Sequence, residues 1–157
     1  MKKNKIWTVI IFIAVPLIVG TLSGVLFSAG DEYGAMVKPP LSPPAWLFPV
    51  VWTILFALMG VSSYLVYKEH VPRGEKKTAL IVYGLQLIVN FFWPLFFFKL
   101  GTYLFAFVWL VILWVLVLIM ILKFVKINKT AGFLQLPYIF WLTFAAYLDL
   151  AVYFLNK

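Results

Sequence analysis

Three apolar stretches of this chain carry aromatic and polar side chains at intervals of three or four residues, which places each set on one face of a helix. The sets are Trp52, Phe56, Met59 and Ser63; Gln86, Asn90, Trp93 and Phe97; and Tyr138, Trp141, Ala145 and Asp149. A polar group that faces hydrocarbon without a partner is costly, so the three faces should turn toward one another. Converging rings with few hydrogen-bonding groups suit a large, flat, mostly apolar ligand.

Packing is the competing explanation for these sets. Rings at helical spacing commonly fill a core, and amides such as Gln86 and Asn90 commonly hold helices together through hydrogen bonds. Because the same pattern recurs in three segments, a binding pocket is favoured over packing.

Asp149 is the one acid within an apolar segment. An ionisable group inside a membrane is a functional candidate by default, and here it would be the basis of an ion- or proton-coupled carrier. The alternative is a solvated acid near the outer end of the last segment. The other acids and the single histidine fall in connections and are expected at the surface: Asp31, Glu32, Glu69, His70 and Glu75.

The chain lacks the catalytic residues that several classes of enzyme require. With no cysteine and one histidine, neither a metal cluster nor a cysteine nucleophile can be assembled. The sequence also has no glycine-rich phosphate loop and no nucleophile–base arrangement. We therefore predict no metal site and no residue for hydrolysis or phosphoryl transfer.

Five apolar segments of spanning length must position the candidate residues, and they run over about 6–27, 45–67, 78–98, 103–122 and 131–155. The 157 residues are 65% hydrophobic and only 11% charged, which is too much apolar surface for one soluble core. The prediction is an all-α integral membrane protein, a bundle of five transmembrane helices in a single domain, 1–157. The first segment also resembles a secretory signal, but its apolar run is longer than a signal centre, so we interpret it as a helix.

Charge predicts the orientation of this bundle. The net charge is +8, and most of the 13 basic residues fall at the amino terminus and in the second and fourth connections. Only three lie on the opposite side: Lys38, Lys99 and Lys157. By the positive-inside rule the amino terminus is cytoplasmic and the carboxyl terminus external. Because the basic residues flank apolar runs, the predicted partner is a lipid bilayer and not a nucleic acid.

Gly20 and Gly24 form a GxxxG motif in the first segment. Such glycines let two helices approach closely, so they are candidates for the interface of a homodimer. The motif alone is unspecific, and close contact between helices does not require a second copy.

The stretch KPPLSPPAWLFPVVW, residues 38–52, leads into the second segment. Proline is tolerated in the first turn of a helix but not in its interior. We therefore predict a stiff, extended approach built by the prolines at 39, 40, 43 and 44, with Pro49 either in the opening turn or at a kink. The approach would form the rim of the pocket, with Trp46 at the membrane interface and Trp52 pointing inward.

Three blocks of sequence resemble the signature of the TspO/MBR family, which comprises the tryptophan-rich sensory proteins of bacteria and the mitochondrial translocator proteins. The blocks are KPPLSPPAWLFPVVWTILFALMG from Lys38, QLIVNFFW from Gln86 and PYIFWLTFAAYLDLAVYFLN from Pro137. The resemblance covers nearly the whole chain. It implies a five-helix bundle, often dimeric, with a ligand cavity that opens toward the connection between the first two helices.

The resemblance also implies ligands. Family members bind porphyrins such as protoporphyrin IX, and some bind sterols and synthetic isoquinolines or benzodiazepines. Matched residue by residue, the implied pocket consists of Pro44, Phe48, Trp52, Asn90, Trp93, Tyr138, Trp141 and Ala145. The spacing of the three sets adds Phe56, Gln86 and Asp149 as ligand-binding candidates.

The chain departs from the family pattern at three positions. Many relatives have Asn where this chain has Asp149, and an aromatic residue where it has Leu41. The sterol-recognition tyrosine of the mitochondrial members aligns with Leu150, so sterol binding is not carried over.

The leading prediction is a receptor or transporter-like protein of a bacterial cell membrane that binds protoporphyrin IX or haem and has no obligatory cofactor. The alternative is an enzyme, because some relatives degrade protoporphyrin in light and oxygen. Trp52 and Trp141 would assist that reaction by stabilising radicals. An enzyme is less favoured than a binding protein, and a carrier that depends on Asp149 alone is the least favoured.

Overall fold

The computed structural model describes residues 2–27 and 32–157. Its helices are α1 (Lys2–Leu26), α2 (Glu32–Ala35), α3 (Leu47–Lys68), α4 (Arg73–Pro94), the π-helical turn η1 (Leu95–Lys99), α5 (Tyr103–Ile127), α6 (Lys129–Phe133) and α7 (Leu136–Leu155). Five helical spans are long and apolar enough to cross a membrane, which confirms the predicted fold class. Asp31, predicted as a surface acid, lies outside the described residues.

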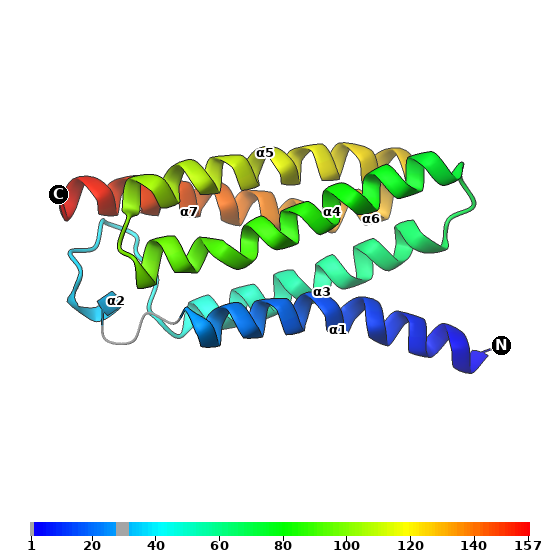
Figure 1. Cartoon of the computed structure of the whole chain (residues 1–157), viewed down its shortest axis with the longest axis horizontal. Helices are drawn as coiled ribbons and strands as arrows, with labels where there is room; N and C mark the ends of the chain where they lie inside the picture. The colour runs from blue at the N-terminus through cyan, green and yellow to red at the C-terminus, as the bar shows by residue number, and fades with distance from the viewer. Residues whose placement is uncertain (1, 28–31) are drawn as a thin grey trace.

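The long helices run along one axis, and the two termini lie at opposite ends, as five crossings require (Figure 1). One end holds the amino terminus and the α3–α4 and α5–α6 connections, and we call it the basic end. The other, the loop end, holds the α1–α3 and η1–α5 connections and the carboxyl terminus. α5 packs between α4 and α7, whereas α1 packs chiefly on α3.

Glycine lets α1 and α3 approach closely. A Cβ at Gly60 would come within 2.6 Å of the Phe12 carbonyl oxygen and would also meet the backbone of Ile13. Beside this crossing the two helices are also joined by rings, since Phe12 packs on Tyr67 with 4.9 Å between centroids. α1 is therefore a member of the bundle with its own packing surface.

The helix ends differ from the sequence prediction in two places. The third span ends in η1, which follows Pro94, a residue without an N–H for the α-helical pattern. The last span is divided into α6 and α7 by the turn at 134–135. α6 is capped by Asn128, whose Oδ1 accepts from the Ala131 N–H at 3.0 Å, while its Nδ2 donates to Glu69 at 2.7 Å.

The proline-rich approach contains a turn, so the prediction of an extended segment is wrong for residues 39–42. The Ser42 N–H donates to the Pro39 carbonyl at 3.4 Å, and Leu41 has a positive φ of 69°. α3 then begins at Leu47, which places Pro49 in the opening turn of the helix and not at a kink.

Candidate ligand-binding cavity

Two adjoining chambers lie at the loop end of the bundle. The side chamber has a volume of about 570 Å³ and lies between α1, α3, α4 and η1, with Tyr33 of α2 at its edge. The aromatic chamber has about 20 Å³ of free volume and lies between α3, α4, η1, α7 and the connection that contains α2. Both chambers are lined by the same five rings: Tyr33, Phe48, Trp52, Trp93 and Phe98. We refer to the two chambers together as the cavity.

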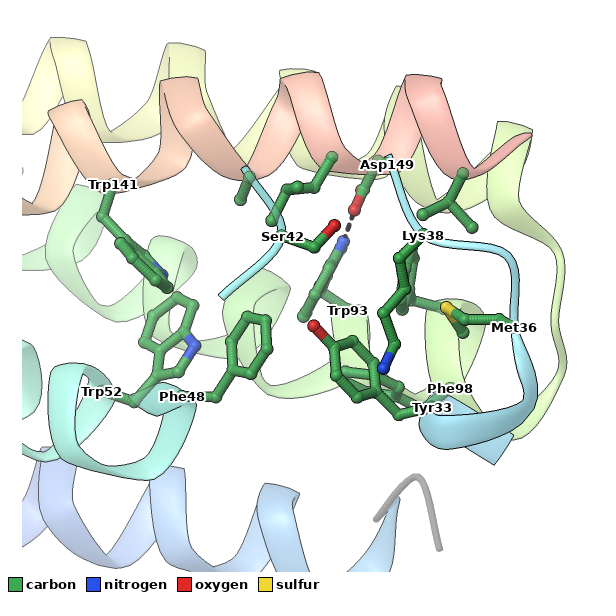
Figure 2. A pocket seen from close by; sticks show the side chains of 14 residues that line it. Tyr33, Met36, Lys38, Ser42, Phe48, Trp52, Trp93, Phe98, Trp141 and Asp149 are labelled. Atoms are coloured by element: carbon green, nitrogen blue, oxygen red, sulfur yellow. Dashed lines mark hydrogen bonds between the residues drawn. The ribbon is translucent and has the colours of Figure 1, made fainter. Parts of the chain in front are cut away.

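Several rings of the aromatic chamber pack edge to face. Figure 2 shows Phe48 and Trp52 from α3 opposite Trp141 from α7. Phe48 and Trp141 lie 6.0 Å apart at 72°, and Phe48 and Tyr33 lie 5.4 Å apart at 84°. This arrangement is favourable for aromatic pairs, and it fills the chamber with its own side chains. Most of the open volume is therefore in the side chamber.

Asp149 fixes the orientation of Trp93. The Trp93 Nε1–H donates to Asp149 Oδ2 at 2.9 Å, and the carboxyl side chain is only 1% exposed. The indole also stacks on Phe97, with 5.1 Å between centroids and 19° between planes. The bond joins α4 to α7 and holds one ring face of Trp93 in the cavity wall.

A second buried network lies behind this wall. Asn90 Nδ2 donates to the Tyr138 hydroxyl, which donates to Gln86 Oε1, both at 2.7 Å. The Gln86 amide then donates to the sulfur of Met59 at 3.7 Å. Because every step joins different helices, the network couples the cavity wall to the core.

The structure brings most of the predicted site residues together. The aromatic chamber is lined by Phe48, Trp52, Trp93, Trp141, Ala145 and Asp149. The side chamber is lined by Phe48, Trp52, Phe56, Asn90 and Trp93. Gln86 and Tyr138 line neither chamber, because they are buried against each other. Pro44 also lines neither, and its carbonyl accepts the Leu47 N–H at 3.0 Å where α3 begins.

Gly20 and Gly24 both line the side chamber. A Cβ at Gly20 would meet the ring of Phe56, whereas a Cβ at Gly24 would meet nothing within 4 Å. Gly20 is therefore used for contact within the chain, and a contact between two copies stays a prediction.

Sequence reasoning missed the part of the wall that comes from the connection, namely Tyr33, Met36, Lys38 and Ser42. Irregular segments have no period, so only their tertiary contacts show which side chains face the cavity. Phe98 was missed because it lies in η1, where the period changes. The face of α1 was missed because this helix is apolar on all sides.

The connection is held against α7 at two points. The Val37 N–H donates to Asn156 Oδ1 at 2.9 Å, and Asn156 Nδ2 donates back to the Val37 carbonyl at 2.8 Å. The Tyr147 hydroxyl donates to the Pro40 carbonyl at 2.8 Å. α7 and the residue that follows it, Asn156, thus supply both a wall of the cavity and the anchors of the connection.

Tyr33 closes the connection on itself. Its hydroxyl donates to the Pro43 carbonyl at 2.8 Å, and burial raises its pKa above the usual value. The hydroxyl therefore stays protonated, and remains a donor, throughout the physiological pH range.

The cavity offers ring faces and very few polar groups. Within residues 2–27 and 32–157, no three His, Asp or Glu side chains gather closely enough to hold a metal ion. This arrangement can hold a planar apolar molecule by stacking and orient it by a small number of polar contacts.

A comparison with protein families assigns the fold and the cavity to one group. The model of the TspO/MBR family matches residues 12–155. This chain belongs to the TspO/MBR family.

Individual TspO/MBR proteins match over most of their length. The chain is 35% identical to the tryptophan-rich protein TspO of Chlorobaculum tepidum, over 98% of both chains. It is 33% identical to protein CrtK of Rhodobacter capsulatus, over 85% of this chain and 84% of the relative. It is 35% identical to the translocator protein of Ovis aries, over 74% of this chain and 70% of the relative.

The TspO/MBR match takes in both chambers of the cavity, the first span from Phe12 onward and the other four spans. As a member of this family the protein is an integral membrane protein. The match ends one residue before Asn156, the side chain that holds the connection at Val37.

Proposed function

We propose that this membrane protein is a receptor or transporter-like protein that binds tetrapyrroles, such as protoporphyrin IX or haem, and other flat apolar ligands. The observation that carries the proposal is the wall of rings from four parts of the chain: Tyr33, Phe48, Trp52, Trp93, Phe98 and Trp141. A tetrapyrrole presents a wide planar face to such rings. The side chamber, at about 570 Å³, falls within the range of about 300–1,000 Å³ that is usual for small-molecule sites.

Tryptophan fluorescence tests this proposal. Protoporphyrin IX added to the protein in nanodiscs should quench the emission saturably, because the ligand would lie against Trp52 and Trp93. Trp141→Phe and Asn90→Ala should each weaken binding by about three- to tenfold, since the first reduces the ring area of the wall and the second removes one of its polar groups.

Trp7→Phe is the matched control, because Trp7 is exposed on α1 and lines neither chamber. It should lower the total emission without changing the midpoint of quenching. Unchanged midpoints in both Trp141→Phe and Asn90→Ala would show that the ligand binds elsewhere.

Light-dependent degradation of the bound porphyrin is the second candidate function. It is supported by Trp52 and Trp141, since both indoles line the aromatic chamber and Trp52 also faces the open volume of the side chamber. Illumination of the complex in oxygen should then give a discrete chromophoric product that Trp52→Phe abolishes. Bleaching at the same rate in Trp52→Phe, without such a product, would argue for binding alone.

A further inference from the structure

Lys38 is the one basic side chain among the residues that line the aromatic chamber. Its Nζ lies 4.4 Å from the centroid of the Tyr33 ring. Figure 2 shows the Lys38 side chain extending beside Trp93 toward the Tyr33 ring. The ammonium group therefore stands beside a wall that is otherwise made chiefly of rings.

The backbone on both sides of Lys38 is fixed. Val37 is held by two hydrogen bonds with Asn156, of 2.9 and 2.8 Å. The Pro39 carbonyl accepts the Ser42 hydroxyl at 2.7 Å, and Pro39 itself is buried. A lysine on a fixed backbone loses less conformational freedom when it binds an anion than one on a free loop.

A second ionisable side chain, Asp149, lies deeper in the same chamber. Asp149 is buried and holds Trp93 through Oδ2. A carboxylate of a ligand is favoured beside the Lys38 ammonium group, whereas the buried Asp149 carboxyl group, already bonded to Trp93, offers it no positive charge. The two side chains thus define one orientation for a ligand that has an apolar ring and an acidic edge.

We propose that Lys38 binds a carboxylate of the ligand, so that the cavity selects planar ligands with an acidic edge over neutral ones. The inference rests on the proposed function and names the chemical class of its ligand. The macrocycle lies in the side chamber, where most of the open volume is, and the carboxylate reaches past Tyr33, whose ring lines both chambers, to the Lys38 ammonium group.

Protoporphyrin IX and its dimethyl ester test this inference, because they share the macrocycle and differ only in the two acidic groups. Lys38→Gln should weaken binding of the acid by about three- to tenfold, a moderate effect because the pair is partly exposed to solvent. Binding of the dimethyl ester should change by less than about twofold, because the ester has no carboxylate to pair with the Lys38 ammonium group. Lys38→Arg keeps the charge and should retain most of the affinity for the acid.

Lys157→Gln is the matched control. Lys157 lies at the same end of the bundle and also stands over rings, 5.7 Å from Tyr153 and 5.4 Å from Phe154, but it lines neither chamber. Its replacement should leave both ligands unaffected. An equal loss in Lys157→Gln would assign the effect to surface charge, and this would overturn the inference.

Two further outcomes would also overturn it. An equal loss for acid and ester in Lys38→Gln would give Lys38 a role in the connection only, and no loss for either would leave it without a role. A failure of the proposed function is distinct, because then neither ligand would quench the unmodified protein saturably.

Discussion

Leu41 adopts a backbone conformation that residues with a Cβ rarely occupy. Its φ is 69° and its side chain is 82% exposed, so few contacts offset the strain. The turn from Pro39 to Ser42 requires a positive φ at its third residue, where glycine is favoured. Left-handed backbone costs an L-residue about 1–2 kcal/mol. The bond from Tyr147 to the Pro40 carbonyl helps to hold the turn in place.

Leu41→Gly should stabilise the protein by about 0.5–1 kcal/mol, since the relief of strain exceeds the entropy that glycine adds to the unfolded chain. The measurement is thermal unfolding in detergent, together with the rate of proteolysis within residues 32–46. Leu41→Ala keeps the Cβ and should give no gain. Equal stabilisation by Ala and Gly would assign the effect to the exposed side chain and not to the backbone.

Single residues of the site could be predicted where a helix fixes their direction. Trp52, Trp93 and Trp141 follow from periodicity, because a face toward neighbouring helices is set by the backbone alone. Periodicity does not show how deeply a side chain is buried. The sequence therefore predicts Tyr138 in the cavity wall, whereas its hydrogen bonds to Asn90 and Gln86 hold it behind that wall. Lys38 could not be predicted, since its position depends on bonds between the connection and α7.

At the scale of helices, the crossing of α1 and α3 depends on Gly60. A Cβ there would meet backbone atoms of α1, and backbone cannot rotate away as a side chain can. At Gly20 the neighbour is the ring of Phe56, which borders the side chamber and has space into which it could turn. The two glycines of the same contact therefore differ in what a substitution would cost.

Gly60→Ala should lower the free energy of unfolding by about 1–3 kcal/mol, because α1 must move away from α3. Gly84→Ala is the control, since Gly84 also lies within a span and a Cβ there meets nothing within 4 Å. Alanine is the better helix former, so this variant should be neutral or slightly stabilised. Thermal unfolding in detergent compares the two, and similar values would exclude a close crossing at Gly60.

The five spans could be predicted because length and hydropathy suffice to define them. The π-helical turn and the break between α6 and α7 could not, because local sequence does not reveal what satisfies the backbone there. After η1 the Thr102 N–H and hydroxyl both bond to the Phe96 carbonyl, at 2.9 and 3.0 Å. At the break the Ser62 hydroxyl bonds to the Ala131 carbonyl at 2.6 Å. The hydrogen bonds that satisfy the backbone at these two breaks depend on distant parts of the chain or on the local backbone geometry.

For the whole molecule, the distribution of charge predicts which end faces the cytoplasm. The chain has no cysteine, so a single introduced cysteine reports the location of one position. Gly34 lies at the loop end and Gly74 at the basic end, and a Cβ at either meets nothing within 4 Å. In intact cells an impermeant maleimide should label Gly34→Cys, whereas Gly74→Cys should react only after permeabilisation. The reverse labelling pattern would show that the loop end, and not the basic end, faces the cytoplasm.

Free volume is distributed unevenly along the bundle. The cavity occupies the loop end, whereas the basic end contains side chains without any exposed surface, such as Val66, Ala79 and Phe124. Pressure favours states of smaller volume, and its effect grows with the void volume that is lost. Compression should therefore bring the rings around the side chamber together while the basic end hardly changes. A planar molecule in the chamber would oppose this collapse, so compressibility would distinguish a filled cavity from an empty one without any chromophore.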